Sequence, residues 1–285
     1  MTTAFRARRG LRLAVVVVAL SLTAAACGKD KSPNAGSNKP ADNTNTVEQG
    51  RDLKTVQAGK LTVCSDIPYA PFEYQENGDL KGIDVDLVRA ITGRLGLSAD
   101  FRDTDFDGIF AALKAGQCDI IASSVSITDE RKKQNDFSAG YFKIHQSLLV
   151  RKGEEAKYKD LPDLKGKTIG VQSGTTGADY AKAHASGAQV KEFTGADELF
   201  TALKAGQVDA ALQDQPVNAY NAKVTGQSVV AKVFDEGAPE EYGFVIPKGK
   251  DALKKAIDNA LSQVRSDDSY RTILTNYLGS TAGQA

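Results

Sequence analysis

The chain has 285 residues, of which 41% are hydrophobic and 25% are charged, a composition typical of a soluble globular protein rather than a disordered or fibrous one. Its 36 basic residues balance its 36 acidic residues. Because the basic excess of a nucleic-acid-binding protein is absent, we expect no DNA or RNA partner.

The first 26 residues have the pattern of an export signal. Four arginines precede an apolar run at residues 13–26, which is short for a membrane span but fits the core of a signal peptide. A buried N-terminal helix is the alternative, and the basic flank disfavours it. Arg8 and Arg9 leave the twin-arginine export route open beside the general one.

The apolar run ends in LTAAAC, which resembles the lipobox of bacterial lipoproteins, where the cysteine becomes the lipidated first residue. Ala24 stands where that pattern usually has leucine, and an ordinary signal-peptidase site is the alternative. We expect lipid on Cys27 to anchor the protein outside the cytoplasm. Loss of residues 1–26 removes four arginines and no acid, so 36 minus 4 basic residues face 36 acidic ones, a net charge of about −4.

Residues 27–50 are almost free of large apolar side chains and rich in Asn, Ser, Pro, Gly and charge. Such a segment cannot bury enough surface to fold, so we expect a disordered tether.

Beyond the tether, Cys64 and Cys118 remain, in an oxidising compartment. A disulfide between them and two separately buried thiols are both open, because sequence alone does not show their spacing. Neither of the two histidines belongs to a cluster of metal ligands, so no metal or cofactor is expected.

Ten residues are nearly repeated, as FAALKAGQCD at 110–119 and FTALKAGQVD at 200–209. Each copy predicts an amphipathic helix that stops at a glycine, Gly116 or Gly206, in the left-handed conformation. The helices are expected over residues 109–114 and 199–204.

A short apolar run follows each glycine, at 118–122 and at 208–212, and is typical of a buried parallel strand. Eight residues after each glycine come Ser124 and Asp214, where open α/β sheets place ligand-binding groups. A helix-stop phrase used twice is the alternative, but it does not explain the common offset. The repeat therefore predicts two similar α/β lobes.

Four further motifs appear in order: GKLTVCSDIPYAPFEY at 59–74, GIDVDLVR at 82–89, DFDG at 105–108 and SSVSITDER at 123–131. With them the chain resembles the bacterial extracellular solute-binding proteins of family 3, the polar amino-acid-binding components of ABC importers. The resemblance runs over residues 51–280.

The resemblance implies an α/β, two-lobed, periplasmic-binding-protein-like fold of type II with two crossover hinge strands. Lobe 1 is expected to comprise residues 51–142 and 242–285, and lobe 2 residues 146–238. The hinges fall at 141–146 and 237–242, where backbone rotation closes the lobes over a ligand.

Two residues are expected to bind the carboxylate of an amino acid. Arg131 offers a planar fork for bidentate binding, as the matching arginine does in the family. A solvent-exposed Arg in the first turn of a helix opened by Thr128 is the alternative. Thr176 precedes a helical stretch at 178–185, where backbone N–H groups favour an anion. Plain capping of that helix is the alternative for Thr176.

The ammonium group is expected to meet Asp214 from lobe 2 and the oxygen atoms of Ser124 and Ser126 from lobe 1. Asp214 alternatively caps the turn before Pro216. Because each lobe would hold part of one small ligand, binding favours the closed state.

The ligand side chain is expected to meet Asp66, Tyr69, Phe106 and Gln172. Two aromatic rings favour a flat, aliphatic or cationic group, although ordinary core packing is the more common use of an aromatic residue. A basic or amide side chain fits these residues better than an acidic one, because no Lys or Arg is among them, although Lys143 near the hinge could supply a cation.

The function implied is capture of an amino acid outside the cytoplasm by a membrane-anchored monomer that delivers it to an ABC permease with its ATPase. A sensor that presents the same ligand to a receptor is one alternative. A dehydratase-type enzyme on the same fold is another, but no Ser-His-Asp or Cys-His pattern is evident, so we expect no catalysis.

Overall fold

The structure is a computed structural model that describes residues 53–279. The expected export signal at 1–26, the tether at 27–50 and the lipidated Cys27 lie outside the described residues. From residue 53 to residue 279, no helix combines the length and the apolar character needed to cross a membrane.

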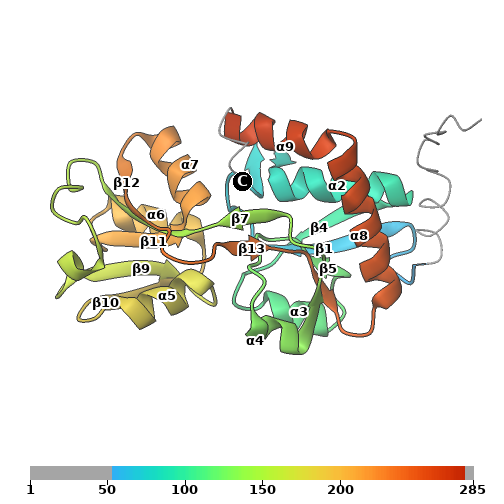
Figure 1. Cartoon of the computed structure of the whole chain (residues 1–285), viewed down its shortest axis with the longest axis horizontal. Coiled ribbons are helices and arrows are strands. Elements are labelled where there is room, and N and C mark those ends of the chain that lie inside the picture. Colours follow the sequence, from blue (N-terminus) through green and yellow to red (C-terminus); the bar gives the residue numbers. More distant parts are fainter. Residues whose placement is uncertain (1–52, 280–285) are drawn as a thin grey trace, which may run out of the picture. The chain divides into compact units, whose positions relative to one another are not determined.

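Lobe 1 contains a mixed five-stranded sheet. On one face lie α2 (Ile83–Leu95), α8 (Asp251–Ser266) and α9 (Ser269–Leu278), packed together, and on the other lies α3 (Ile109–Lys114) (Figure 1). Side chains alternate along a strand, so Val63 packs in the cluster with α2 and α8 while Cys64 packs with α3. The strand order is β4 (Ser98–Asp103), β1 (Lys60–Ser65), β5 (Ile120–Ile121), β14 (Val245–Pro247) and β6 (Asn135–Phe137). Lobe 1 also contains α4 (Asp129–Gln134), and β2 (Tyr74–Glu76) pairs with β3 (Asp79–Lys81) as a hairpin.

Lobe 2 repeats this arrangement. Its strand order is β10 (Gln189–Phe193), β9 (Thr168–Gln172), β11 (Ala210–Asp214), β8 (Gln146–Arg151) and β12 (Ser228–Phe234). The remaining elements are α5 (Thr176–His184), α6 (Ala196–Lys204), α7 (Gln215–Thr225) and the short 3-10 helix η1 (Leu161–Leu164). In each lobe the third strand of the parallel set has an antiparallel neighbour: β14 pairs with β5 in lobe 1, and β8 pairs with β11 in lobe 2. The predicted pair of similar α/β lobes is confirmed by this common order.

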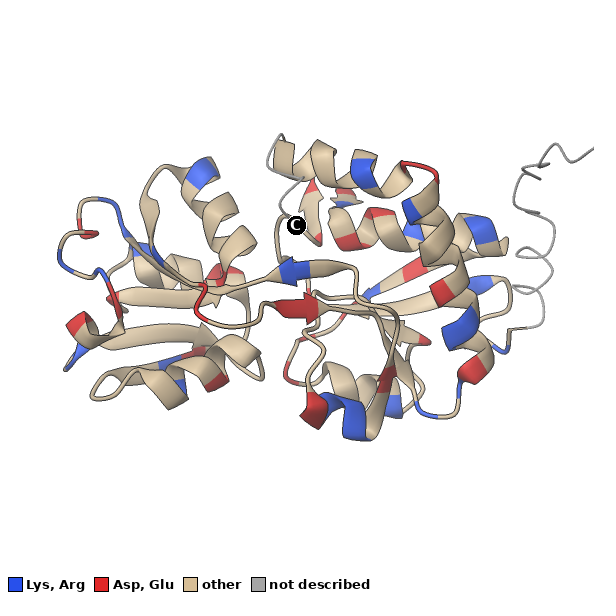
Figure 2. Cartoon of the chain, viewed as in Figure 1, with Lys and Arg blue, Asp and Glu red and all other residues tan. Residues whose placement is uncertain are grey.

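Two strands cross between the lobes. They are β7 (Phe142–Ile144) and β13 (Glu240–Tyr242), which pair antiparallel with Glu241 opposite Lys143 (Figure 2). Both lie within the segments expected as hinges.

The repeated decapeptide builds the same structure in each lobe. Gly116 and Gly206 have φ of 71° and 74°, the left-handed conformation expected at these helix ends. The aspartate that ends each copy of the decapeptide binds the first strand of its lobe. In lobe 1, the Asp119 carboxylate accepts from Val56 N–H and from Thr62 N–H of β1, at 2.8 and 2.7 Å.

In lobe 2, the Asp209 carboxylate accepts from Thr168 N–H and from the Tyr158 hydroxyl, each at 2.9 Å. The strands after the repeats begin later than predicted, at Ile120 and Ala210, and β5 has only two residues. The reason is that each aspartate turns its side chain to the neighbouring strand, so regular pairing begins one residue beyond it.

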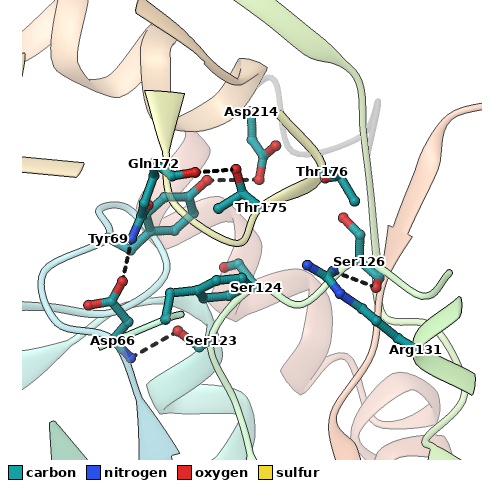
Figure 3. A pocket seen from close by; sticks show the side chains of 11 residues that line it. Asp66, Tyr69, Ser123, Ser124, Ser126, Arg131, Gln172, Thr175, Thr176 and Asp214 are labelled. Carbon is teal, nitrogen blue, oxygen red and sulfur yellow. Dashed lines mark hydrogen bonds between the residues drawn. The ribbon is translucent and has the colours of Figure 1, made fainter. Parts of the chain in front are cut away.

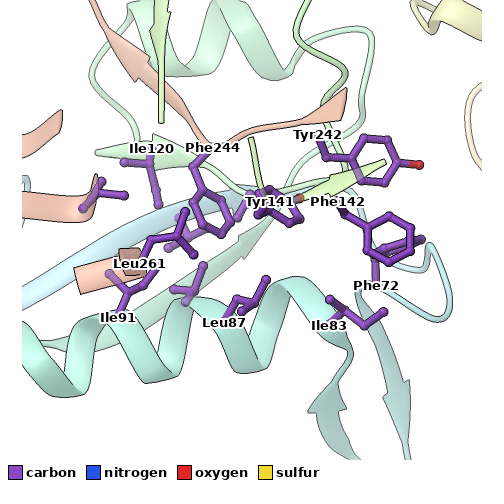
Figure 4. Close-up of a cluster of buried hydrophobic side chains, with 14 of the residues drawn as sticks. Phe72, Ile83, Leu87, Ile91, Ile120, Tyr141, Phe142, Tyr242, Phe244 and Leu261 are labelled. Carbon is purple, nitrogen blue, oxygen red and sulfur yellow. The ribbon is translucent and has the colours of Figure 1, made fainter. Parts of the chain in front are cut away.

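The core of lobe 1 includes aromatic residues of both crossover strands (Figure 4). Phe72 packs edge-on against Phe142 and against Tyr242, with ring centroids 5.2 Å apart in both pairs. Cys64 and Cys118 form a disulfide on the α3 face of the sheet, which decides between the two alternatives left open by the sequence.

Candidate functional site

A pocket with about 300 Å³ of empty space, part of it open to solvent, lies where the carboxyl ends of the parallel strands of both lobes meet. All nine residues expected to bind a ligand line it, together with Ser123 and Thr175 (Figure 3). Lys143, the cation considered for an acidic ligand, is exposed and does not line it. The lining is Asp66, Tyr69, Phe106, Ser123, Ser124, Ser126, Arg131, Gln172, Thr175, Thr176 and Asp214.

Asp214 is a buried carboxyl held by neutral donors. Tyr69 Oη donates to it at 2.8 Å and Gln146 Nε2 at 2.6 Å, and the Tyr242 hydroxyl also donates. Although Asp214 stands at the N-cap of α7, its side chain makes no capping bond. Burial, and then the nearby charge of Glu240, raise the pKa of Asp214 to about 6. A ligand cation would stabilise the ionised form.

Arg131 is the cation of the pocket. Its Nη1 donates to Ser126 O at 2.9 Å and its Nη2 to Gly174 O of lobe 2 at 3.1 Å. The guanidinium lies over Phe106 and Phe110, 5.6 and 5.4 Å from the ring centroids. Burial lowers the pKa of Arg131, and none of the ion pairs found among residues 53–279 includes it.

At the start of α5, helix capping and pocket lining by a hydroxyl fall to two different threonines. Thr175 caps the helix, because its Oγ1 accepts from Ala178 N–H at 3.1 Å. Thr176 is therefore not the capping residue, and its hydroxyl faces the pocket, 3.4 Å from Gln146 Nε2. Sequence reasoning missed Thr175 as a lining residue, although two consecutive threonines before a helix were the available signal.

The opposite end of the pocket is organised around Asp66. Gln172 Nε2 donates to Asp66 Oδ2, and Gln172 Oε1 accepts from Gln213 Nε2 at 3.1 Å. Burial raises the pKa of Asp66 to about 7 against the lowering effect of the Gln172 bond. Gln213 was not found from the sequence, since nothing in its local pattern distinguishes it from a buried strand residue.

The chemistry of the pocket suits a molecule with separated charges. Asp66 and Asp214 place two buried carboxyls around one guanidinium, Arg131. Aromatic surface lies between them on Tyr69 and Phe106, which are each 7% exposed. Among the described residues, no group of histidine, cysteine, aspartate or glutamate is arranged to hold a metal ion.

Comparison with known proteins supports the resemblance. The L-cystine-binding protein TcyJ of Escherichia coli K12 is 30% identical over 82% of this chain and 88% of its own length. The glutamine-binding protein GlnH of a Bacillus subtilis ABC transporter is 31% identical over 93% of this chain and 96% of its own. The crystal structure of an ancestral arginine-binding protein bound to arginine superposes with a TM-score of 0.73 at 38% identity, covering 78% of this chain and 99% of the other.

The family model for bacterial extracellular solute-binding proteins, family 3, matches residues 61–280. Together with the two-lobed fold and the pocket between the strand ends, this match shows that the chain belongs to the bacterial extracellular solute-binding proteins of family 3.

Proposed function

We propose that the chain captures a polar L-amino acid in this pocket and delivers it to an ABC permease, held outside the cytoplasm by lipid on Cys27. Arg131 and the start of α5, with Thr176, bind the ligand carboxylate. Asp214, with Ser124 and Ser126, binds the ammonium. Relatives that bind glutamine and arginine support this class of ligand.

One observation favours a basic side chain over an amide. When ionised, Asp66 and Asp214 carry two negative charges against the single positive charge of Arg131. A basic amino acid carries two positive charges and one negative charge, so each charge finds one partner of opposite sign. A ligand with a neutral amide side chain would bring no positive charge to Asp66, which would stay protonated and bonded to Gln172.

The proposal is tested by a thermal-shift screen of the exported chain against the twenty amino acids and ornithine, followed by calorimetry. A ligand that binds only the folded state raises the melting temperature by mass action. We expect the largest shift from a basic amino acid, with amides next. If no amino acid shifts the melting temperature, or if one is consumed, the proposal is wrong.

Two variants test the residue roles. Arg131→Ala and Asp214→Ala are each expected to abolish measurable binding while the far-ultraviolet circular dichroism spectrum stays that of the wild type. Lys132→Ala, an exposed position on the same helix as Arg131, is the matched control and should bind normally. Retained affinity in either pocket variant would remove that residue from the site.

A further inference from the structure

Two fully buried carboxyls, Glu73 and Asp84, lie behind the pocket without lining it. They come from the motifs at 59–74 and 82–89, whose backbones are pinned together. Asp84 N–H donates to Phe72 O at 3.0 Å. A Cβ on Gly82, which has φ of 133°, would lie 1.9 Å from Phe72 O, so only glycine permits this approach. The pairing of these two backbones brings the two acids to the same place.

Glu73 holds the lining residues at the Asp66 end of the pocket. Ser123 Oγ donates to Glu73 Oε1 at 2.9 Å and accepts from Asp66 N–H at 2.9 Å. Ser124 Oγ lies 3.5 Å from Glu73 Oε2. The backbone of Glu73 also exchanges hydrogen bonds with that of Tyr69, at 2.6 and 3.2 Å. Glu73 therefore contacts three residues that line the pocket, and it reaches a fourth, Asp66, through Ser123.

Asp84 joins the pocket to a crossover. Its Oδ2 accepts from Ser124 N–H at 2.9 Å and from the Tyr141 hydroxyl at 2.6 Å. Ser124 has φ of 50°, a left-handed conformation that a non-glycine residue keeps only when its surroundings hold it there. Tyr141 directly precedes β7, so the same carboxyl contacts the pocket and the hinge.

The two acids cannot both ionise without large cost, because they are buried beside each other. Burial raises the pKa of Glu73 well above its usual range, and the charges of Asp84 and Asp66 raise it further, against hydrogen bonds from Ser123 and Ser124. Burial raises the pKa of Asp84 to about 7, against hydrogen bonds from Tyr141 and Ser124. No lysine or arginine is among these described neighbours.

The hydrogen bonds distinguish the two carboxyls. Asp84 receives a backbone N–H and a phenol hydroxyl on Oδ2, which are the donors that an anion needs, while its Oδ1 is buried without a hydrogen-bond partner among the described residues. Glu73 meets only the hydroxyls of Ser123 and Ser124, which accept as readily as they donate. The fixed donors on Asp84 Oδ2 therefore favour Glu73 as the carboxyl that keeps its proton.

We propose that Glu73, as a neutral acid, and Asp84, as its ionised partner, are positioning residues that hold Ser123, Ser124 and Asp66 in the geometry that binds the ligand. The inference rests on the proposed function, because it assigns these acids to the same pocket. Glu73 acts through Ser123 on the residue that meets the ligand side chain, and Asp84 acts on the backbone of Ser124.

The test uses the whole exported chain with L-arginine and L-glutamine as calorimetric probes at pH 7.5. Glu73→Gln keeps the shape and neutrality of the protonated acid, whereas Glu73→Ala leaves the serine hydroxyls without their partner. We expect Glu73→Gln to bind within about threefold of wild type and Glu73→Ala to bind about tenfold or more weakly, the effect of roughly one lost hydrogen bond. Glu76→Gln, on the exposed part of β2, is the control and should change nothing.

A second measurement does not depend on ligand. The urea midpoint of ligand-free Glu73→Gln at pH 7.5 should equal or exceed that of wild type, while Glu73→Asp, which shortens the acid, should lower it. Wild-type affinity in Glu73→Ala would overturn the positioning role, and a lowered urea midpoint or tenfold weaker binding in Glu73→Gln would overturn the neutral assignment. If the Ala variant does not fold, Glu73→Gln decides alone. Failure of the wild type to bind any amino acid would instead refute the proposed function.

Discussion

The ionisation of Asp66 should make binding of a basic amino acid depend on pH more steeply than binding of an amide. Asp66 is 9% exposed, and its pKa in the ligand-free pocket is raised to about 7. A ligand cation pairs only with the ionised carboxyl, so below this pKa the proton must leave first. At pH 5, two units lower, that step costs about 2.7 kcal/mol, or roughly a hundredfold in affinity.

Asp214 adds a smaller effect for every amino acid, because all of them carry the ammonium. Its pKa of about 6 lies one unit above pH 5, which corresponds to about tenfold in affinity. Between pH 8 and pH 5 we therefore expect L-glutamine to bind about tenfold more weakly and L-arginine about a thousandfold more weakly. Calorimetry at each pH, in two buffers that differ in ionisation enthalpy, measures both the affinity and the number of protons released.

Asp66→Asn is the decisive variant. It should remove the additional hundredfold, so that the L-arginine profile becomes parallel to that of L-glutamine. Ligand-free wild type should also lose stability as pH rises from about 4 through 7, because a raised pKa favours the protonated carboxyl in the folded state, and Asp66→Asn should reduce this loss. Equal pH profiles for the two ligands in wild type, or an unchanged arginine profile in Asp66→Asn, would refute this reasoning.

Two further predictions concern stability. Asp119→Ala should lower the free energy of unfolding by about 2–4 kcal/mol, because two backbone N–H groups lose a charged acceptor. Asp209→Ala should lower the free energy of unfolding by less, since Asp209 is only half-buried. Urea unfolding of both variants measures the two losses, and an Asp119→Ala variant as stable as the wild type would contradict this prediction. Replacing Cys64 and Cys118 by serine opens a loop spanning 54 residues and should lower the free energy of unfolding by about 4 kcal/mol. A wild-type unfolding free energy that reductant leaves unchanged would argue against the bridge.

Local features of this chain could be predicted because they depend on neighbours in sequence. A helix stop at Gly116 or Gly206 requires only a residue that adopts positive φ. Capping by Thr128, whose Oγ1 accepts from Arg131 N–H at 3.2 Å, spans three residues. The repeat also predicted the positions of Ser124 and Asp214, since the same helix, turn and strand place both at the end of a parallel strand.

The network around each charge could not be predicted in this way. Asp214 binds Tyr69, Gln146 and Tyr242, which come from 145, 68 and 28 residues away in the chain. These distant donors hold the Asp214 carboxyl in the pocket, so that it does not cap α7.

Sequence by itself determined the two-lobed α/β plan, the family and the residue types at the strand ends, because these follow from local periodicity and motifs. Tertiary structure alone decided that Cys64 pairs with Cys118, that Thr175 rather than Thr176 caps α5, and that Glu73 and Asp84 both contact Ser124. The physical reason is that hydrogen-bond partners, burial and pKa depend on groups brought together only when the chain folds.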